Sequence, residues 1–594
     1  MIVCIAEKPS VAKSIAELIG AKKKNNGYFE GNGYQVTWTF GHLCTLKEPH
    51  DYNENWKYWK LEDLPIFPAN FGVKLIKNNG VENQFQIIKT LIKKCEEVIN
   101  CGDAGQEGEL IQRWVLLKAK CNVPVKRLWV SSLTEEAIIE GFKNLSESKK
   151  YDNLYAAGSA RAIGDWVLGI NGTRLFTKKF GIGKSTLSIG RVQTPTLAMI
   201  VERKKEIENF SSAEYWELKT IYKEQEFNCQ IKRISSKEKA EKGIIYLSDK
   251  LFEIISFEQK KVKENPPRLY DLTSLQVDAN KKFGFSADKT LKLTQELYEN
   301  KTITYPRVDT SYLTEDLYPK IPGILKKLKS YSKFTENILT KPITKSKNIF
   351  NNKKITDHHA IIPTGIDLLN IKDDKKSIYD LICKRFIAVF HEPCIISNTI
   401  VIGKVGSLNF KKSGKQILKP GWKYIYNEDI NKKEIDNSSN INITNFKQGE
   451  KGTHKPIMHK GKTSPPKHYT EATLLRAMET AGKQVKDEEM RELMKENGIG
   501  RPSTRSNIIE TLLKREYILK KNKKIIATEN GTKLIDAIQN KILKSAQLTG
   551  EWEKKLRLIE KGKYNIKLFK EELYKMVREL TDEVIFNNSY NNFK

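Results

Sequence analysis

Short apolar runs alternate with amphipathic segments over about the first 120 residues of the chain. Residues 2–6, IVCIA, form an apolar run that predicts a buried strand, and Ser10 can cap the helix predicted to follow it. The same order returns in residues 96–120, where an apolar strand leads to Asp103 and a helix follows. Such β-α units predict a mainly parallel sheet whose ligand site lies beyond the carboxyl ends of its strands. Glu7 and Asp103 both fall at that edge.

The pattern changes after about residue 150 to long amphipathic helices, one of them predicted over residues 274–300. Residues 214–262 and 396–463 instead alternate apolar and polar positions, which predicts β-strands. Nearer the C-terminus, a helix predicted in residues 500–518 precedes a predicted hairpin with an Asn530-Gly531 turn. That order is typical of a winged-helix-like arrangement.

At 594 residues the chain is too long for a single hydrophobic core and should divide into several domains. The predicted fold class is a multidomain protein with an α/β part, α parts and a β part. The predicted units are an N-terminal parallel-sheet domain at 1–152, a helical base with winged-helix-like elements at 153–213 and 465–594, a β-rich domain at 214–263 and 396–464, and a helical domain carrying Tyr305 at 264–395.

The chain is strongly basic, with 103 lysines and arginines against 72 acidic residues and a net charge of +31. Such a charge suits a polyanionic partner, because each neutralised phosphate releases condensed counterions. A general bias of the source proteome towards lysine and asparagine would also produce it. Arginines recur inside the short motifs, however, where a guanidinium can bind phosphate through two hydrogen bonds, and this favours nucleic acid.

The eight cysteines never fall in a C-x-x-C pair, so the sequence supports neither a zinc ribbon nor a secreted disulfide framework. We expect a reducing compartment, no zinc and a cytoplasmic protein. The N-terminal apolar run is too short for a signal peptide, and no stretch approaches the roughly 18 apolar residues of a membrane span. We therefore expect no membrane association.

Acidic side chains gather at the two predicted strand ends. They are Glu7, Asp103, Glu107 and Glu109. Carboxylates at a sheet edge suit Mg²⁺, which prefers a few hard oxygen ligands together with water and phosphate. A surface acid at a strand end would explain either group alone, but acids on two β-α turns favour a metal site. The interleaved glycines would let the backbone approach a phosphate.

A nucleotide-binding loop is not indicated. The stretch FGIGKST ends like a phosphate loop, but Lys178 stands where that pattern requires glycine. No G-x-G-x-x-G follows a predicted strand. We therefore expect no dependence on ATP.

A β-type run at residues 302–305 stops at Pro306 and presents Tyr305 close to Arg307. A tyrosine at a strand end is most often a core residue. It can also attack a phosphodiester when cations hold the phosphate in line. Arg307 could clamp that phosphate and Lys8 could protonate the departing ribose oxygen, with Mg²⁺ organising the neighbouring phosphates. The chemistry is complete only if these distant segments meet.

Seven motifs occur in a fixed order: IAEKPSVAKSIA, WTFGHL, GDAGQEGELI, LSIGRVQTPTLAMIVERKKEIENF, ITYPRVDTSYL, DHHAIIPT and GIGRPSTRSNIIETLLKREYI. In this series the chain resembles the type IA DNA topoisomerases, in particular the bacterial-type topoisomerase III branch. The resemblance extends from Met1 to about Gly562. It implies a TOPRIM domain joined to a toroidal arch that encloses DNA.

The resemblance also implies the chemistry. Tyr305 cuts one strand and keeps its 5′ phosphate covalently, another strand passes through the gap, and the break is resealed, which relaxes negatively supercoiled DNA or decatenates linked DNA. By the same match Glu7, Asp103 and Glu107 are metal-binding acids, and Lys8 and Arg307 contact the scissile phosphate. His358, with His359 as the alternative, is the active-site histidine.

The single-strand-binding segment is matched by Ser188, Ile189, Gly190, Arg191, Val192, Gln193 and Thr194. Arg161 and Asp165 match residues that line the path to the active site. We expect single-stranded and underwound DNA as partner, a helicase as a further candidate partner, a monomer, and a nucleoid-associated location. A solvated helix face would explain Arg191 and Gln193 without the match.

Two features depart from the family pattern. The family commonly shows Asp-x-Asp-x-Glu in its TOPRIM domain, but here Gly105 replaces the middle acid, which puts a second metal ion in doubt. Many relatives also carry C-terminal zinc-binding cysteines, and this chain has no cysteine after Cys394.

Two other classes of function stay open. A TOPRIM nuclease or primase would use the acids but not Tyr305, and a non-enzymatic single-strand binder would need no Mg²⁺. Covalent attachment of the protein to DNA distinguishes all three. The sequence does not separate relaxation from decatenation.

Overall fold

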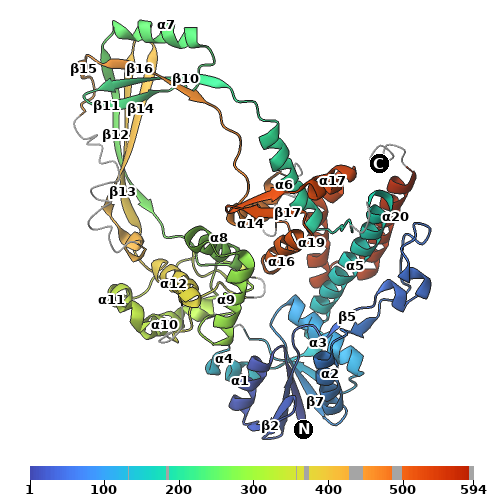
Figure 1. Ribbon diagram of the computed structural model, residues 1–594. Helices are drawn as coiled ribbons and strands as arrows, with labels where there is room; N and C mark the ends of the chain where they lie inside the picture. Colours follow the sequence, from blue (N-terminus) through green and yellow to red (C-terminus); the bar gives the residue numbers. More distant parts are fainter. Residues whose placement is uncertain are drawn as a thin grey trace.

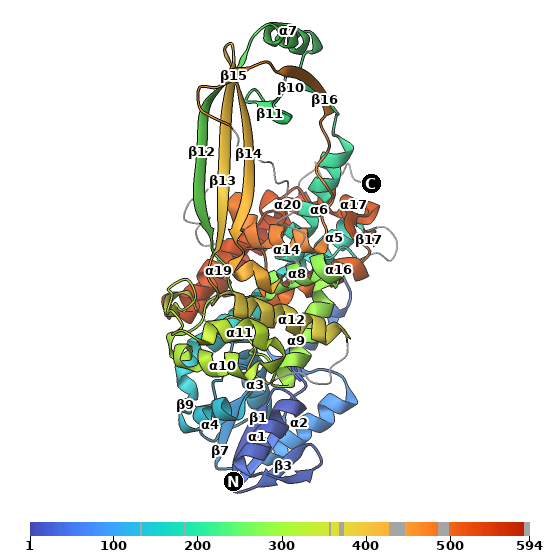
Figure 2. The same ribbon diagram turned by 90° about the vertical axis from the view of Figure 1, so that its left-hand side faces the viewer.

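The computed structural model describes residues 1–130, 133–181, 186–355, 358–366, 373–426, 446–484 and 498–586. Its elements follow one another around a ring (Figure 1). An N-terminal α/β unit and a helical base lie on one side of the ring, and a long β-sheet forms the opposite side (Figures 1 and 2). Part of the phosphate-loop-like stretch, residues 182–185, lies outside the described residues.

The N-terminal unit contains a seven-stranded sheet in the order β2-β3-β4-β1-β7-β8-β9, whose four central strands are parallel. The strands are β1 (Ile2–Ala6), β2 (Lys23–Asn25), β3 (Tyr28–Gly31), β4 (Tyr34–Trp38), β7 (Glu97–Cys101), β8 (Val125–Arg127) and β9 (Ser146–Glu147). The helices are α1 (Pro9–Ile19), α2 (Asn79–Ile92), α3 (Gln106–Ala119) and α4 (Glu135–Lys143). A small hairpin of β5 (Cys44–Leu46) and β6 (Val73–Leu75) packs beside them. The predicted β-α units are confirmed.

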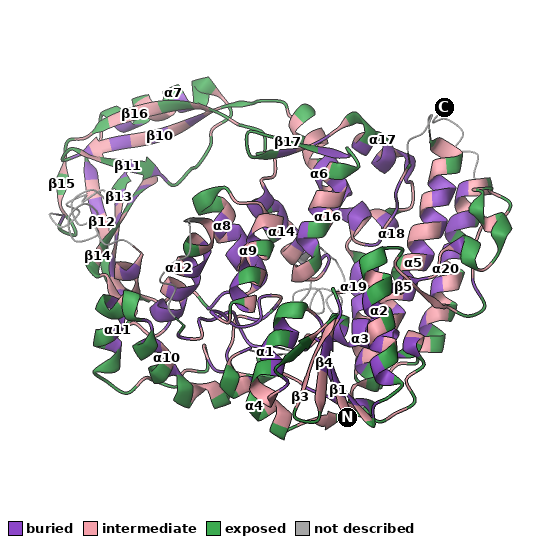
Figure 3. Cartoon of the chain, turned by 60° about the horizontal axis from the view of Figure 1, so that its bottom comes forward, coloured by how far each residue is buried: buried purple, intermediate pink, exposed green. Residues whose placement is uncertain are grey.

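Strand β1 is buried on both faces (Figure 3). Val3 and Ile5 join the core that contains α2, α3 and the helical base, and Cys4 and Ala6 join the core that contains α1 and the tyrosine region. Successive side chains of a strand point to opposite faces, so one strand contributes to two cores. The sheet is thereby fixed between the base and the segment that carries Tyr305.

The start of α1 differs from the prediction. The helix begins at Pro9, and its N-cap residue is Lys8, which makes no side-chain capping bond. Ser10 therefore lies inside the first turn. Proline suits the first turn because the backbone N–H that it lacks has no intrahelical partner there.

The base consists of helices drawn from two distant parts of the chain. They are α5 (Asp152–Phe180), α6 (Gln193–Glu208), α14 (Glu471–Thr480), α16 (Pro502–Lys514), α17 (Glu529–Ala537), α18 (Lys541–Lys544), α19 (Gln547–Glu560) and α20 (Ile566–Phe586), with the hairpin β17 (Ile518–Lys521) and β18 (Lys524–Ala527). The predicted helix-and-hairpin order is present, but the turn lies at Asn522 and Lys523, which both have positive φ. The Asn530-Gly531 pair lies in α17, capped by Thr528.

The arch is a seven-stranded antiparallel sheet in the order β15-β12-β13-β14-β11-β10-β16. Its strands are β10 (Glu214–Tyr222), β11 (Gln225–Cys229), β12 (Phe252–Glu264), β13 (Cys394–Val405), β14 (Leu408–Lys419), β15 (Lys451–Gly452) and β16 (Lys455–Lys462), and α7 (Lys237–Ser248) packs at its far end. The long strands β12, β13 and β14 rise side by side from the tyrosine region (Figure 2). Within the described residues the predicted β-rich segments are confirmed, except that Lys237–Ser248 form a helix.

The tyrosine region holds α8 (Leu272–Phe283), α9 (Ala287–Glu299), α10 (Ile321–Lys327), α11 (Ser332–Leu339) and α12 (Asp373–Ala388). The single helix predicted over residues 274–300 is wrong. Gly284, in the left-handed region at φ 72°, ends α8, and Ser286 caps α9 through the backbone N–H of Lys289. Short 3-10 helices lie at Pro49–Asp51, Glu54–Lys57, Ser148–Tyr151, Glu315–Lys320, Lys329–Tyr331, Asn352–Lys354, Gly421–Ile425 and Ala481–Gln484.

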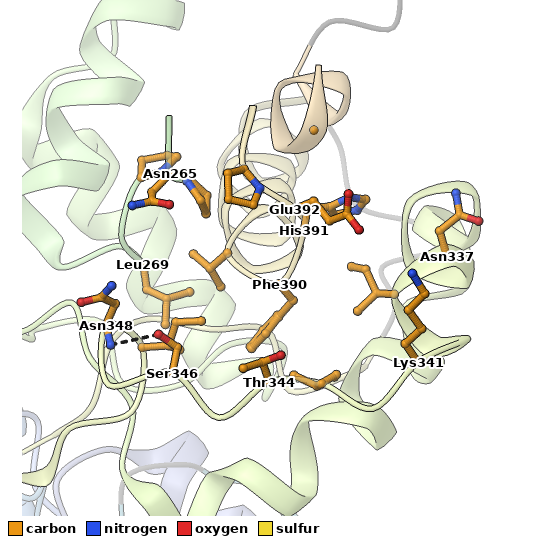
Figure 4. Close-up of a pocket in the computed structure, with 18 of the residues that line it drawn as sticks. Asn265, Leu269, Asn337, Lys341, Thr344, Ser346, Asn348, Phe390, His391 and Glu392 are labelled. Atoms are coloured by element: carbon orange, nitrogen blue, oxygen red, sulfur yellow. Dashed lines mark hydrogen bonds between the residues drawn. The ribbon is translucent and has the colours of Figure 1, made fainter. Parts of the chain in front are cut away.

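A pocket of about 1020 Å³ lies where the arch strands join the tyrosine region (Figure 4). Leu269, Ser346, Phe390 and His391 are among its lining residues, and Tyr305 is not. This pocket is therefore separate from the candidate chemistry. No helix in the described part of the chain combines the length and the apolar character that crossing a membrane requires.

Candidate active site

Tyr305 lies at the interface between the tyrosine region and the N-terminal unit. The β-type run before it forms an isolated bridge from Ile303 to Pro363, rather than the predicted strand, with Thr304 N donating to the Ile362 carbonyl at 2.9 Å. The side chain of Tyr305 is buried, with 9% of the residue exposed. Its ring lies 4.4 Å from that of His358, measured between centroids.

The two predicted strand-end acids lie side by side. Strands β1 and β7 are parallel neighbours with Ala6 opposite Cys101, so the residues that follow them emerge at one edge of the sheet. The backbone N–H of Asp103 donates to Oε2 of Glu7 at 3.1 Å. Burial, followed by the negative charge of Asp103, raises the pKa of Glu7 to about 7. Two neighbouring carboxylates favour a shared proton or a cation.

Tyr305 reaches this acid pair directly. Burial raises the pKa of Asp103, and its interactions with Arg307, Lys8 and the Tyr305 side chain oppose that rise. Burial, and then the negative charge of Asp103, raise the pKa of Tyr305 well above its ordinary value, and the nearby Arg307 opposes that rise. The phenol is therefore protonated at neutral pH and lies against a group that can accept its proton.

Two cations face the same point. Arg307 lies among Tyr305, Asp103 and Glu7. Burial acts against its charge, but the carboxylates of Asp103 and Glu7 help to raise its pKa. Its Nε is buried without a hydrogen-bond partner, so it can donate to an incoming anion. Lys8 is paired instead, with Nζ lying 2.6 Å from Oε1 of Glu299. Sequence reasoning missed Glu299.

His358, rather than its neighbour, faces the tyrosine. Its Nε2 bonds to the backbone carbonyl of Ala104 in the acid loop, and burial lowers its pKa to about 4. Its Nδ1 is buried without a partner, and the ring of Trp129 stacks parallel to it with centroids 6.4 Å apart. His359 bonds to the carbonyl of Ala360 at 2.8 Å. The structure thus favours His358 over His359, and it adds Trp129, which sequence reasoning missed.

The other two acids of the loop, Glu107 and Glu109, have partners of their own and do not pair with Glu7 or Asp103. Glu107 is exposed and accepts from His42 Nε2 at 2.5 Å. Glu109 is fully buried and pairs with Arg127, also fully buried, at 3.0 Å. Arg127 donates to the carbonyls of Gly102 and Asp103, so this ion pair holds the acid loop in place. The sequence held only one indication of this ion pair, namely that Arg127 ends a strand, which the structure places next to β7.

The acid pair fits a divalent cation. Glu7 and Asp103 supply hard oxygens at one point, and a cation would relieve the repulsion that contributes to the raised pKa of Glu7. No three acid, histidine or cysteine side chains form a preassembled metal cluster among the described residues. Gly105, where the family pattern has an acid, has φ 158° and ψ 170°, a conformation that side-chain-bearing residues rarely adopt.

The predicted strand-binding segment lies in the loop after α5 and in the first turn of α6, and most of it is buried. Ser188, Ile189, Arg191, Gln193 and Thr194 are each less than 9% exposed, while Gly190 and Val192 are partly exposed.

The structure brings Arg191 together with Arg161 and Asp165. Nε of Arg191 lies 3.1 Å from Oδ1 of Asp165, and both arginines bind the buried carboxylate of Glu553. Sequence reasoning missed Glu553, because it lies in helix α19, outside the seven family motifs. Arg161 also donates from Nε to Gln106 at 3.0 Å, which connects this cluster to the turn that follows the acid loop.

Comparison with known proteins gives consistent matches. Residues 149–570 match the family model described as DNA topoisomerase, and residues 2–133 match that of the Toprim domain. A protein named DNA topoisomerase 3 from Bacillus cereus is 40% identical over 98% of this chain and 81% of its own length. Its namesake from Bacillus subtilis is 37% identical over 100% of this chain and 82% of its own length. The full-length topoisomerase I structure from Thermotoga maritima superposes with a TM-score of 0.73 at 24% identity, covering 98% of this chain and 90% of that one, and shows the shared fold.

Proposed function

The chain belongs to the type IA DNA topoisomerases of the topoisomerase III branch, and we propose that it breaks one DNA strand at a time by transferring a phosphodiester to Tyr305. The observation that carries this proposal is the position of Tyr305 beside Asp103 and the unpartnered Nε of Arg307. A nucleophile, a proton acceptor and a phosphate ligand therefore meet at one point.

In the proposed step the phenol oxygen of Tyr305 attacks phosphorus and its proton passes to the carboxylate of Asp103. The bond from phosphorus to the 3′ oxygen breaks, the 5′ phosphate stays on Tyr305, and Lys8 gives a proton to the departing 3′ oxygen. Arg307 holds the charge that develops on the phosphate. Religation reverses the step. The phosphotyrosine retains the bond energy, so the cycle needs no ATP.

Mg²⁺ would be held by Glu7 and Asp103, with Glu107 as the third proposed ligand after it leaves His42, and would neutralise phosphate charge. His358 stays neutral at physiological pH because burial lowers its pKa to about 4. Its Nε2 hydrogen bond to the Ala104 carbonyl leaves Nδ1 as an acceptor close to the Tyr305 ring.

Closure of the interface hides the nucleophile. Polar contacts that cross from the N-terminal unit to the tyrosine region include Lys8 with Glu299, the Ala104 carbonyl with His358, and Glu140 with Lys320 at 3.8 Å. Because Tyr305 is only 9% exposed, we propose that these contacts separate to admit a strand and separate again, after cleavage, to let another strand pass.

The architecture suits this cycle. We propose a TOPRIM domain at 1–152, a base at 153–213 and 465–594, an arch at 214–263 and 396–464, and a tyrosine domain at 264–395, with DNA passing inside the ring. Single-stranded or underwound DNA would reach Tyr305 along the segment Ser188–Thr194. We further propose that the protein acts as a monomer near the nucleoid and that a helicase supplies single-stranded substrate.

The test uses negatively supercoiled circular DNA, Mg²⁺ and the purified chain. We expect a ladder of relaxed topoisomers, and protein bound covalently to 5′ ends after the reaction is stopped with denaturant. Free nicked ends without attached protein would indicate a nuclease instead, and binding without any strand break would indicate a non-enzymatic protein. Comparing relaxation with unlinking of catenated circles then assigns the preferred reaction.

A further inference from the structure

Glu553, from helix α19, joins two arginines that belong to the proposed strand path. Nη2 of Arg161 lies 2.8 Å from its Oε2, and Nη1 of Arg191 lies 3.0 Å from its Oε1. Nη1 of Arg161 also donates to that Oε1. One carboxylate, 392 positions from Arg161 and 362 from Arg191, thus fixes the spacing of the two guanidiniums.

The two acids around Arg191 are in different environments. The side chain of Glu553 is 7% exposed and that of Arg191 is 3% exposed, whereas the side chain of Asp165 is 47% exposed. Arg191 also lies over the ring of Trp552, 5.2 Å from its centroid. Breaking a buried ion pair leaves an uncompensated charge and is costly, whereas an exposed pair contributes little. Asp165 is therefore the acid that an incoming anion can displace.

Both guanidiniums keep hydrogen-bonding capacity while Glu553 holds them. A guanidinium has five N–H donors. The bonds to Gln106 and Glu553 occupy three donors of Arg161, and those to Asp165 and Glu553 occupy two donors of Arg191. A strand phosphate can therefore bind without separating either arginine from Glu553.

The same cluster fixes the backbone of the strand-binding segment. Thr549, also on α19, donates from Oγ1 to the carbonyl of Arg191 at 3.0 Å. Helix α19 thus holds both the main chain and the side chain at this position. Through Gln106, Arg161 is in turn connected to the first turn of α3, next to the acid loop.

We propose that Glu553 is a positioning residue for the strand site: it keeps Arg161 and Arg191 seated while a phosphate of the bound strand takes the place of Asp165 on Arg191. The proposal rests on the proposed function and goes beyond it by giving the two acids opposite roles. Glu553 supports strand binding, and Asp165 competes with the strand. The exchange replaces one anionic oxygen on Arg191 Nε by another, so no charge is left buried without a partner.

The test compares three acid-to-amide variants that raise the net charge equally. They are Glu553→Gln, Asp165→Asn and, as the matched control, Glu572→Gln, which removes a half-exposed partner of Lys555 away from the cluster. The dissociation constant of a fluorescent single-stranded oligothymidylate is measured in EDTA, over a series of salt concentrations, with each full-length variant below its thermal midpoint.

We expect Asp165→Asn to tighten binding by about two- to fivefold. The slope of log affinity against log salt concentration should become steeper by up to about 0.7, because one more phosphate is neutralised. Glu553→Gln should weaken binding by about tenfold or more despite the same gain in charge. Glu572→Gln should match the wild type. If Glu553→Gln does not fold, Glu553→Asp keeps the charge but shortens the side chain, and it should weaken binding as well.

Two results would overturn the proposal. Tighter binding by Glu553→Gln, equal to that of Asp165→Asn, would make Glu553 only another competing anion. A lower thermal midpoint with an unchanged dissociation constant and salt slope would make its role purely structural. Failure of the wild type itself to bind the oligonucleotide would instead refute the proposed function.

Discussion

Nζ of Lys8 lies 2.6 Å from Oε1 of Glu299, and this ion pair joins the loop after β1 to the end of α9, just before Tyr305. The two residues are 291 positions apart. Lys8 is the proposed donor to the scissile phosphate, so we expect its ion pair with Glu299 to compete with DNA for Lys8.

Glu299→Gln should favour opening of the active site. Both partners are about a quarter exposed, so we expect an effect of at most about 1 kcal/mol, or a rise of up to about fivefold in the association rate of single-stranded DNA. Stopped-flow fluorescence with a labelled oligonucleotide measures it. The matched control is Glu140→Gln, which removes the longer and more exposed pair with Lys320 across the same interface and should change the rate little. A rate equal to that of the wild type in both variants would contradict this competition.

Tyr305→Phe should abolish the covalent adduct and leave single-strand binding within about twofold of the wild type. The hydroxyl is the proposed nucleophile, whereas the ring still packs against His358. Denaturing gel electrophoresis of a labelled oligonucleotide detects the adduct. Tyr298→Phe, which alters the buried neighbouring ring, should retain adduct formation. Equal loss of binding and cleavage in Tyr305→Phe would indicate a structural tyrosine.

Arg307→Ala should lower the rate of strand cleavage by about 10²- to 10³-fold at saturating DNA, because the charge that develops on the phosphate loses its donor. Single-turnover cleavage of an oligonucleotide measures the rate. Arg515→Ala removes the same charge from an exposed site at the end of α16 and serves as control. If both variants cleave alike, Arg307 is not part of the active site.

Glu7 should make the protein less stable as pH rises in EDTA. Its pKa is raised to about 7 in the folded protein from about 4.5, so between these values the native state holds more protons than the unfolded state. Stability is therefore unaffected by this group below about pH 4.5 and falls by about 3 kcal/mol by pH 7 and above.

Thermal unfolding of the wild type and Glu7→Gln measures this difference. The stability advantage of Glu7→Gln over the wild type should grow from pH 4.5 to 7. Mg²⁺ should stabilise the wild type alone, because the cation needs the ionised carboxylate, and should thereby reduce this advantage. An advantage that does not change with pH would show that Glu7 ionises normally.

Gly105→Asp should not create a second metal site, although it restores the acid of the family pattern. An added Cβ would meet no atom within 4 Å, but φ is 158°, so the backbone would be strained by about 1–3 kcal/mol. We expect a lower thermal midpoint and no decrease in the Mg²⁺ concentration that half-saturates cleavage. Gly33→Asp, at another open position with φ 81°, controls for backbone strain away from the site. A lower half-saturating Mg²⁺ concentration in Gly105→Asp, but not in Gly33→Asp, would contradict this expectation.

Much of the molecule could be predicted from local patterns in the sequence and from the order of the motifs. Apolar runs of period two and helical repeats predicted the N-terminal β-α units and the β-rich arch, and the strand ends placed Glu7 and Asp103 at one edge. Two of the errors lay where a single residue decides the backbone. Gly284 splits the helix predicted as continuous, and Pro9 starts α1 ahead of the predicted cap.

The sequence alone determined the family, the element types and the chemical character of the groups, since these depend on residues close together in the chain. Only the tertiary structure decided which distant groups meet: Tyr305 with Asp103, Lys8 with Glu299, and Glu553 with its two arginines. These neighbours follow from how whole domains bury their surfaces against each other. That burial is a sum over many non-local contacts, and no local spacing encodes it.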